Sequence, residues 1–268
     1  MIPKIIHYCW FGRNPLPESA QKCIASWRKF FPDYEIKEWN EDNFDVNSIP
    51  YTQQAYEAKK YAFVSDYARF WILYHYGGLY FDTDVEVIRS MDAIIARGPF
   101  MGCEKPAIDG SDPLRMDVAP GLGLGVNPGL GLYKEILESY DSFHFINPDG
   151  SLNKTTIVEY TTKILCKHGL KNTHDIQQVA GVWIYPHDFF APKNVDTKEL
   201  VITENTVSIH HYDSSWAEWY DKALGERAPK LKKYLGNHLG SFVNIVIYAY
   251  QRWGIKGICK KIKESIIR

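Results

Sequence analysis

Hydrophobic and polar positions at the start of the chain change their spacing twice. Pro3–Trp10 is a short, mostly apolar run, Ser19–Phe30 has the spacing of an amphipathic helix, and Asp33–Trp39 alternates between apolar and polar side chains. This order predicts a strand, a helix and a second strand. A β-α-β unit of this kind indicates two parallel strands joined by a right-handed crossover.

The longest helical pattern lies further along the chain. Apolar side chains recur at the helical period over Ala55–Tyr76, and Gly77 with Gly78 ends the pattern as a C-cap. The next segment, Leu79–Ile88 (LYFDTDVEVI), is predicted to be a strand. Weaker patterns predict two more helices and two more strands, over Tyr133–Tyr140, Ile157–His168, Val182–Tyr185 and Val207–His211. The expected fold class is therefore α/β, with a central, mostly parallel sheet.

A change of composition near residue 227 predicts two parts. Residues 1–227 form the α/β domain in this interpretation, and residues 228–268 form a basic, amphipathic helical tail. In the tail, the apolar run Phe242–Tyr250 stands among Lys and Arg residues, with Glu264 as the single acid. Such a segment is typical of a peripheral contact with anionic lipid. A solvated helix packed on the domain fits the pattern equally well.

Charge and cysteine content narrow the function classes. Lys and Arg number 31 against 32 Asp and Glu, so the formal net charge of −1 gives no general attraction to nucleic acid. The five cysteines form no CxxC pair, which argues against a zinc site or a disulfide framework. No signal-peptide pattern is present, and no apolar run reaches the roughly 20 residues of a membrane span. We therefore expect a cytoplasmic location, with the tail as a peripheral contact on the inner face of the cell membrane.

Two acids, Asp82 and Asp84, follow the apolar part of the predicted strand Leu79–Ile88. In an extended chain, residues two apart point the same way, so both carboxylates would face one spot. Neighbouring carboxylates repel each other, and a divalent cation such as Mn²⁺ or Mg²⁺ relieves the repulsion and can also hold phosphate oxygens. The same D-x-D pattern also describes two surface acids at a strand end, and alone it is a weak signal.

Asp66 and Arg69 lie three residues apart on the predicted helix before these acids. Asp66 falls within the apolar stripe, where a carboxylate is costly to bury unless it is paired. A structural ion pair bracing the helix against the strand is one interpretation. In the other, Asp66 contacts donor-sugar hydroxyls and Arg69 binds the sugar or phosphate. The sequence GGLYFDTD directly afterwards favours the second interpretation.

The run Ser65–Val87 (SDYARFWILYHYGGLYFDTDVEV) closely resembles the signature block of glycosyltransferase family 32. This group of DXD-containing sugar transferases includes bacterial capsule enzymes and yeast mannosyltransferases, and the run is also similar to the glucosylating domains of large clostridial toxins. Pro3–Gly12 and Cys23–Asn43 resemble the first β-α-β unit of the same family. The resemblance extends over roughly residues 2–216. It implies a GT-A type fold, which is a Rossmann-like domain that binds a nucleotide sugar.

The resemblance also implies roles for individual residues. Trp10 stands where the toxin enzymes stack the uracil ring, although a core tryptophan would fit the position too. Tyr80 is expected to lie beside the donor. The catalytic residues implied by the match are Asp66, Arg69, Asp82 and Asp84.

Near the end of the domain, HHYDSSW (His210–Trp216) resembles the segment that closes the site in this family. The toxin pattern of an acid, a serine and a tryptophan falls on His211, Ser214 and Trp216. His211 is thereby expected as the third metal ligand, with His210 and Asp213 as alternatives, and histidine suits Mn²⁺. Ser214 and Trp216 are expected to bind the donor, since the indole N–H can donate to the β-phosphate.

The glycine-rich segment Pro120–Gly131 follows the acids. It lacks the third glycine of a dinucleotide-binding fingerprint and comes long after the first strand. No G-x-x-x-x-G-K-[ST] sequence occurs, which disfavours a P-loop nucleotidase. We interpret the segment as a flexible wall near the sugar, where glycine permits close backbone approach.

The predicted function is a retaining, metal-dependent hexosyltransferase. The donor would be a nucleotide-diphosphate sugar, with UDP favoured over GDP because of Trp10, and Mn²⁺ or Mg²⁺ the cofactor. The acceptor would be a glycan or lipid-linked oligosaccharide in bacterial surface polysaccharide synthesis, which follows from the resemblance alone. Three alternatives remain open: a glycoside hydrolase, which needs two carboxylates farther apart, a non-catalytic nucleotide-sugar or carbohydrate-binding protein, and a metal-dependent phosphoesterase.

Overall fold

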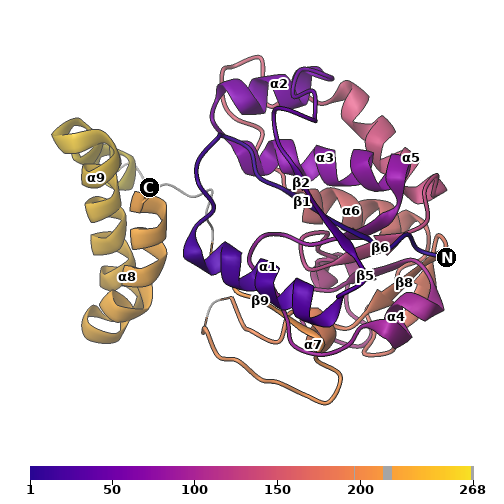
Figure 1. Ribbon diagram of the computed structural model, residues 1–268. Helices are drawn as coiled ribbons and strands as arrows, with labels where there is room; N and C mark the ends of the chain where they lie inside the picture. The colour runs from indigo at the N-terminus through magenta and orange to yellow at the C-terminus, as the bar shows by residue number, and fades with distance from the viewer. Residues whose placement is uncertain (196, 214–218, 267–268) are drawn as a thin grey trace. The chain divides into compact units, whose positions relative to one another are not determined.

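The computed structural model describes residues 1–195, 197–213 and 219–266 (Figure 1). The chain separates into two compact units, Met1–Tyr212 and Asp213–Arg268. The division precedes the boundary expected after residue 227, because helix α8 (Trp219–Leu235) begins earlier and packs against α9 (Asn237–Ile266). Among the described residues, none of the helices is both long enough and apolar enough to cross a membrane.

The first unit is built on a seven-stranded sheet with the order β2-β1-β3-β6-β5-β8-β7. β1 pairs in parallel with β2 and β3, and β5 pairs in parallel with β8. β6 is antiparallel to both β3 and β5, and β7 is antiparallel to β8. Five strands therefore point one way, which confirms the expected α/β class with a mostly parallel central sheet. The strands are β1 (Ile5–Cys9), β2 (Glu35–Trp39), β3 (Gly78–Tyr80), β5 (Phe100–Gly102), β6 (Leu124–Val126), β7 (Gln177–Val179) and β8 (Val182–Tyr185).

Helices cover both faces of this sheet (Figure 1). One apolar cluster contains buried side chains of α3 and α5, and the other contains those of α1 and α4. Successive residues of β3 alternate between the clusters, with Leu79 in the second and Tyr80 in the first. The helices of the unit are α1 (Glu18–Phe30), α2 (Pro50–Glu57), α3 (Tyr61–Tyr76), α4 (Asp92–Arg97), α5 (Gly131–Ser139), α6 (Ile157–Lys167) and α7 (His187–Phe190).

The predicted β-α-β opening is present as β1, α1 and β2. α1 buries the stripe that contains Ile24 and Trp27, and the Trp27 indole N–H donates to the carbonyl of Val85 at 2.7 Å. β1 and β2 pair in register from Ile5 opposite Glu35 to Cys9 opposite Trp39. The amphipathic period of the sequence therefore located this unit to within two residues.

The single long helix expected over Ala55–Tyr76 is wrong. The chain forms α2 and α3 instead, with Lys59 between them in the left-handed region at φ 56°. The α3 C-terminus agrees with the expectation: the Gly77 amide, at φ 64°, donates to the Leu73 carbonyl at 2.9 Å. Gly78 follows at φ 98°, where a Cβ would stand 2.6 Å from the carbonyl oxygen of Ile5, so only glycine allows β3 to pair with β1.

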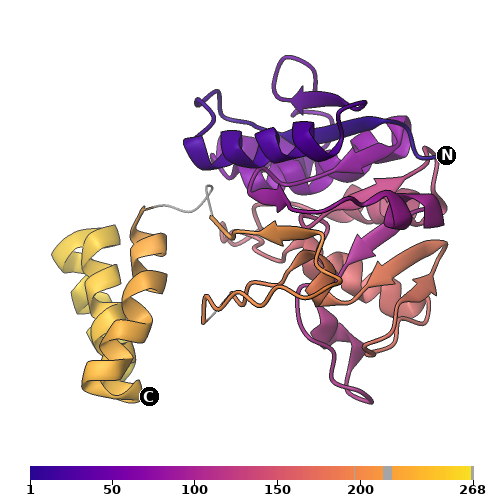
Figure 2. The same cartoon turned by 60° about the horizontal axis from the view of Figure 1, so that its bottom comes forward.

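The single strand expected over Leu79–Ile88 is wrong as well. It divides into β3 and β4 (Val85–Val87), because a turn closes where the Val85 amide donates to the Asp82 carbonyl at 3.0 Å. β4 leaves the central sheet and pairs antiparallel with β9 (Ser208–His210) to form a separate two-stranded sheet (Figures 1 and 2). The two acids therefore lie in the turn at the exit from the central sheet.

The glycine-rich segment Pro120–Gly131 is not a flexible wall throughout. Its central part is the buried strand β6, between β3 and β5. A Cβ on Gly125 would collide with the Phe100 ring, so glycine here permits close packing inside the sheet. The sequence pattern missed this strand because it is three residues long, with a glycine between Leu124 and Val126, and glycine carries little strand signal.

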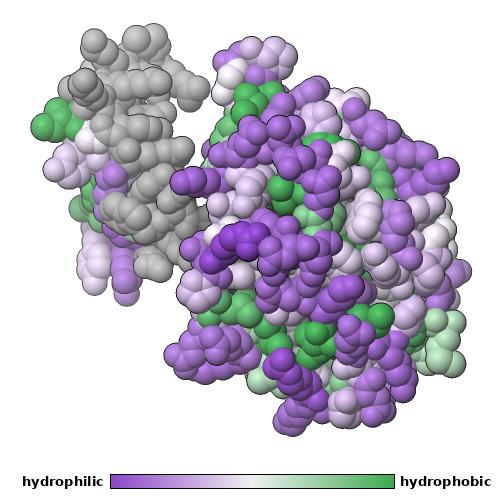
Figure 3. All heavy atoms as spheres, turned by 45° about the horizontal axis from the view of Figure 1, so that its top comes forward, coloured by the Kyte–Doolittle hydropathy of each residue, from purple (hydrophilic) through white to green (hydrophobic). Residues whose placement is uncertain are grey.

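The second unit is a pair of helices. The Arg227 guanidinium donates to Asn244 at 3.3 Å and to Gln251 at 2.8 Å, so hydrogen bonds join α8 to α9. α9 bends at Gly254, whose φ is 65°. Leu239, Phe242 and Tyr250 are exposed. On the face of the first unit that Figure 3 shows, by contrast, apolar residues form small groups separated by hydrophilic ones.

Candidate active site

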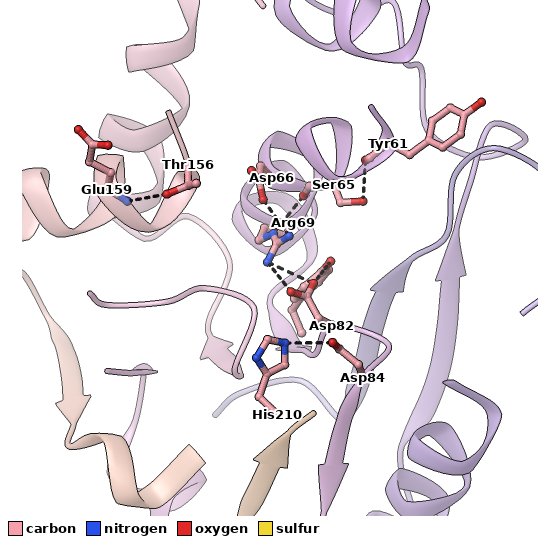
Figure 4. Close-up of polar contacts among 10 residues, drawn as sticks. Tyr61, Ser65, Asp66, Arg69, Asp82, Asp84, Thr156, Glu159 and His210 are labelled. Atoms are coloured by element: carbon pink, nitrogen blue, oxygen red, sulfur yellow. Dashed lines mark hydrogen bonds and ion pairs between the residues drawn. The ribbon is translucent and has the colours of Figure 1, made fainter. Parts of the chain in front are cut away.

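Asp82 occupies the turn directly after β3 (Figure 4). Its amide donates to the carbonyl of Gly121 at 3.1 Å, and the Tyr80 hydroxyl donates to its carboxylate at 3.1 Å. The Arg69 guanidinium lies 3.2 and 3.3 Å from the two carboxylate oxygens. The side chain of Asp82 is therefore fixed on several sides by the interface between α3 and β3.

Arg69 connects this acid to Asp66. Its side chain is 5% exposed, and it donates to the Asp66 carboxylate at 3.0 Å and to the Ser65 carbonyl at 3.1 Å. The guanidinium also lies 4.9 Å from the centre of the Tyr80 ring. The predicted i, i+3 pair is present, and the structure adds Asp82 as a second carboxylate partner of the same cation.

The charges of this cluster depend on one another. Burial opposes the charged form of Arg69, but Asp82, Tyr80 and Asp66 outweigh it, so the net effect raises the pKa of Arg69. Burial raises the pKa of Asp66 to about 6, although Arg69 acts in the opposite direction. A carboxyl group with such a pKa at the end of a buried ion-pair chain is a frequent feature of functional sites.

Asp84 is held by a residue from a distant part of the chain. The His210 Nε2 atom lies 3.0 Å from the Asp84 carboxylate, and both side chains are largely buried. Burial lowers the pKa of His210, but Asp84, together with Asp82 and Glu104, raises it further than burial lowers it. The His210 Nδ1 atom is buried and has no hydrogen-bond partner among the residues that the structure describes.

The structure places His210, rather than the expected His211, beside the two acids. β9 pairs with β4 so that Val85 lies opposite His210. Neighbouring residues of a strand point to opposite faces, and the His211 imidazole accordingly pairs with Glu86 at 2.9 Å. The placement of His210, one of the two alternatives to His211, follows from strand register, which the sequence did not provide.

The acids and His210 fit a divalent cation. Ligand atoms of Asp82, Asp84 and His210 lie within 4.8 Å of one another. Two carboxylates and an imidazole form a donor set suited to Mn²⁺.

Two further expected donor residues lie at the same edge of the sheet. Trp10 follows β1, is partly exposed, and donates its indole N–H to the Asn14 carbonyl at 2.6 Å. Tyr80 is only 1% exposed, and its hydroxyl donates to the Asp82 carboxylate; its expected place beside the donor stays a prediction. Ser214 and Trp216 lie outside the described residues.

Gly121 and Glu104 belong to this site but were not singled out by sequence analysis. A Cβ on Gly121 would collide with the Asp82 carboxylate, so the absence of a side chain there gives the acid its room. Glu104 follows β5, and its carboxylate contributes to the raised pKa of His210. The glycine-rich segment Pro120–Gly131 did indicate a close backbone approach, which occurs at Gly121. No sequence pattern indicated Glu104, because only the order of the strands brings it near the acids.

Comparisons with known proteins agree with this arrangement. Residues 17–101 match the family described as "Glycosyltransferase sugar-binding region containing DXD motif". Inositol phosphoceramide mannosyltransferase 3 of Schizosaccharomyces pombe is 35% identical over 98 residues, which cover 35% of this chain and 27% of the yeast protein. Mannosyl phosphorylinositol ceramide synthase SUR1 of Saccharomyces cerevisiae is 32% identical over 114 residues, covering 40% and 28%. The alignments thus span less than a third of these yeast relatives.

A longer alignment is found with a glycosyltransferase of Acanthamoeba polyphaga mimivirus. It is 26% identical over 229 residues and covers 81% of this chain and 84% of the viral protein. Among solved structures, PaToxG glycosyltransferase has a TM-score of 0.43 at 17% identity, covering 62% of this chain and 69% of its own. Galactosyltransferase LgtC has a TM-score of 0.30 at 15% identity, covering 86% and 96%. Residues 17–101 of this chain are thus similar to DXD-containing sugar-binding regions of glycosyltransferases.

Proposed function

We propose that the protein is a metal-dependent glycosyltransferase that moves a sugar from a nucleotide-diphosphate donor onto an acceptor hydroxyl. The observation that carries the proposal is the convergence of Asp82, Asp84 and His210, whose ligand atoms lie within 4.8 Å of one another beside the buried Arg69–Asp66 pair. Carboxylates this close suit a shared cation and not the two separated acids of a glycoside hydrolase.

Asp82, Asp84 and His210 would hold Mn²⁺ or Mg²⁺, which supplies Lewis-acid neutralisation of the charge on the donor diphosphate. Arg69 is a positioning residue in this proposal. Its guanidinium is already bound to Asp66 and Asp82 and is 5% exposed, so it fixes both carboxylates in place. Asp66 then orients the donor by accepting hydrogen bonds from the sugar hydroxyls.

The transfer exchanges one bond for another at the anomeric carbon. The acceptor oxygen forms a bond to this carbon while the bond from the carbon to the diphosphate oxygen breaks, and its electron pair stays with the diphosphate. We propose that attack occurs on the face from which the diphosphate leaves, and that a phosphate oxygen takes the acceptor proton. The product then retains the anomeric configuration. Linkage analysis of the product by NMR tests this step, and an inverted linkage would rule it out.

The donor base and sugar are the next part of the proposal. Trp10, partly exposed at the end of β1, favours a uridine nucleotide because its ring can stack on the base. The names of the yeast relatives favour mannose as the sugar and a lipid as the acceptor. The resemblance to family 32 favours a glycan or lipid-linked oligosaccharide of surface polysaccharide synthesis. A panel of UDP- and GDP-sugars, assayed for Mn²⁺-dependent donor hydrolysis, separates the choices of base and donor sugar, and the proposal fails if no donor reacts.

We further propose that the second unit makes a peripheral contact with anionic membrane lipid at the cytoplasmic face. Exposed Phe242 and Tyr250 on α9 supply apolar contacts, and exposed Lys232 and Lys233 on α8 supply positive charge. Sedimentation with phosphatidylglycerol vesicles should retain the full chain and lose a chain ending at residue 235. Equal sedimentation of both chains, or of neither, ends this part of the proposal.

A further inference from the structure

A cavity of about 570 Å³ opens next to the candidate active site. One wall comes from the segment between β5 and β6, with Glu104 and Asp117. The other comes from the first turns of α6, with Thr156, Glu159 and Lys163. The size lies in the range of small-molecule sites in proteins.

The strand order fixes where this cavity lies. β1, β3, β6 and β5 are consecutive in the sheet, and β1, β3 and β5 point the same way. Trp10 follows β1, Asp82 follows β3 and Glu104 follows β5, so these three residues share one edge in that order. The acids therefore stand in the middle, with the expected nucleotide side at Trp10 and the cavity on the other side.

Two contacts tie the cavity to the site. The Glu104 carboxylate is close enough to His210 to influence its charge, as described above. The backbone N–H of Ile157, the first residue of α6, hydrogen-bonds to Asp66. Figure 4 shows Thr156 and Glu159 at this end of α6, next to the Asp66–Arg69 pair. The cavity therefore lies near both the metal-binding cluster and the proposed donor-sugar contact, because Glu104 lines it and Ile157 stands between its lining residues Thr156 and Val158.

Three carboxylates and one cation, Lys163, line the cavity together with threonine and apolar side chains. Asp117 pairs with Lys105, and Glu159 pairs with Lys163 at 2.5 Å. Glu104 is only partly exposed, and its carboxylate has no hydrogen bond to another residue in the described part of the chain. An ionised carboxylate accepts hydrogen bonds only, so its natural partners are donors such as sugar hydroxyls. A phosphate or carboxylate on the ligand would meet more negative than positive charge here, because three carboxylates and one lysine line the cavity.

We propose that this cavity binds a neutral sugar residue of the acceptor, with Glu104 accepting hydrogen bonds from its hydroxyl groups. The inference rests on the glycosyltransferase function proposed above and names the acceptor class of that same site. The bound sugar presents one hydroxyl toward the cluster of Asp82, Asp84 and His210, where the donor is held. Asp117 provides a second acceptor on the same wall as Glu104.

The test measures two reactions of the Mn²⁺-loaded full chain, donor hydrolysis and transfer to a soluble acceptor. Wild-type protein is first supplied with methyl glycosides of mannose, glucose and galactose, and with mannose 6-phosphate and glucose 6-phosphate. We expect the best acceptor to be a neutral glycoside. Transfer to a phosphorylated sugar above all neutral ones, or no transfer to any neutral glycoside while the donor is hydrolysed, overturns the inference.

The Glu104→Gln variant then isolates the carboxylate, because glutamine has nearly the same shape. With the best neutral glycoside, the acceptor KM should rise about 10- to 100-fold, the effect of losing a charge-assisted hydrogen bond. Donor hydrolysis should fall by a much smaller factor than transfer, because Glu104 is not one of the three proposed cation ligands, and an unchanged melting temperature reports that the variant is folded. Asp117→Asn should act in the same direction, since asparagine tolerates the φ of 48° at this position.

The matched control is Glu138→Gln, an exposed glutamate of α5 that pairs with Lys134. It should change neither reaction. If Glu104→Gln lowers hydrolysis and transfer equally, Glu104 belongs to the donor site and the acceptor assignment is wrong. If it changes neither reaction, the assignment is also wrong. Absence of donor hydrolysis in the wild-type protein with every nucleotide sugar instead refutes the underlying glycosyltransferase proposal.

Discussion

The two acids of the D-x-D turn are held in different ways. Asp82 takes its partners from the preceding residues of the chain, with Tyr80 and Arg69 both in the α3–β3 stretch. Asp84 takes its partner from β9, near the end of the first unit. The contacts of Asp82 are thus made by residues close to it in the sequence, and these residues lie over a packed core. The contact of Asp84 depends on the three residue pairs that join β4 to β9.

Because of this difference, we expect the Asp82 and Asp84 sides of the site to contribute differently to the stability of the fold and to activity. Arg69 is buried and pairs with both Asp66 and Asp82. Removing Arg69 would leave these carboxylates without their cation, so residues on the Asp82 side contribute to the stability of the fold. His210 sits at the end of a short strand, so the Asp84 side contributes little to the core. We therefore expect substitutions on the Asp82 side to change both stability and activity, and substitutions on the Asp84 side to change activity alone.

The largest effect is expected for Asp84→Asn. Loss of the charge removes a cation ligand while the amide keeps the shape and can still accept a hydrogen bond from His210. Donor hydrolysis with Mn²⁺ should fall about 1000-fold, equivalent to several kcal/mol of electrostatic stabilisation. EDTA should reduce wild-type hydrolysis to a similar level, and Mn²⁺ affinity measured by calorimetry should fall in parallel. An unchanged melting temperature would support the expectation that the Asp84 side affects activity alone, whereas unfolding of this variant would contradict it.

Arg69→Met should lower the free energy of unfolding by about 3 kcal/mol, near the lower end for breaking a buried ion pair. The lower end applies because the Asp82 side chain is 30% exposed and can be partly solvated. Urea denaturation measures the change. Lys22→Met is the control, since this exposed cation also pairs with one carboxylate, Glu18, in an i, i+4 arrangement. Equal stability of the two variants would contradict a structural role for the Asp82 side.

The core beneath Asp82 should also make stability depend on pH. Burial lowers the pKa of His7 to about 4, and its ring accepts from the Trp39 indole at 3.0 Å and donates to the Gly77 carbonyl at 3.0 Å. The pKa of His7 is therefore near 6.5 in the unfolded chain and near 4 in the folded chain. Stability from His7 is therefore complete above about pH 6.5 and falls by about 3 kcal/mol as the pH drops to 4.

The measurement for His7 is the free energy of unfolding between pH 4 and 7. His7→Gln should reduce its slope by the contribution of this one residue, because glutamine does not titrate. The carboxylates titrate in both proteins and cancel in the difference. Parallel curves for the two proteins would show that the pKa of His7 does not change on folding, and the argument that burial keeps its ring neutral would be lost.

A smaller effect distinguishes the two neighbouring histidines. His210→Ala should lower Mn²⁺-dependent hydrolysis about 100-fold through loss of one ligand. His211→Ala removes only the pairing with Glu86, which is partly exposed, and should change the rate less than about threefold. The reverse result would mean that β9 adopts the other register in solution.

The smallest effect is expected at Gly121, whose missing side chain leaves room for the Asp82 carboxylate. Gly121→Ala should displace that carboxylate and lower hydrolysis about 10-fold, the result of a slightly misplaced catalytic group. Gly131→Ala is the matched control, because a Cβ there meets no atom within 4 Å. Equal activity of the two variants would show that the site tolerates movement of Asp82.

The sequence by itself predicted those features that arise from interactions between residues close together in the chain. Periodicity located α1 and the end of α3, and the spacing of Asp66 and Arg69 placed both on one helix face. The two acids were recognised from the sequence even though the expected strand is a turn. These predictions agree with the structure because the helical period, glycine caps and i, i+3 contacts depend only on residues close together in the sequence.

Only the tertiary structure decided the rest. Lys59 breaks the predicted helix, and β4 leaves the sheet, because the chain must turn to pack α2 on α3 and β4 on β9. The register of β9 chose His210 over His211, and the strand order brought Glu104 beside the acids. Each of these contacts joins residues far apart in sequence, where no local pattern specifies which strand pairs with which or in what register.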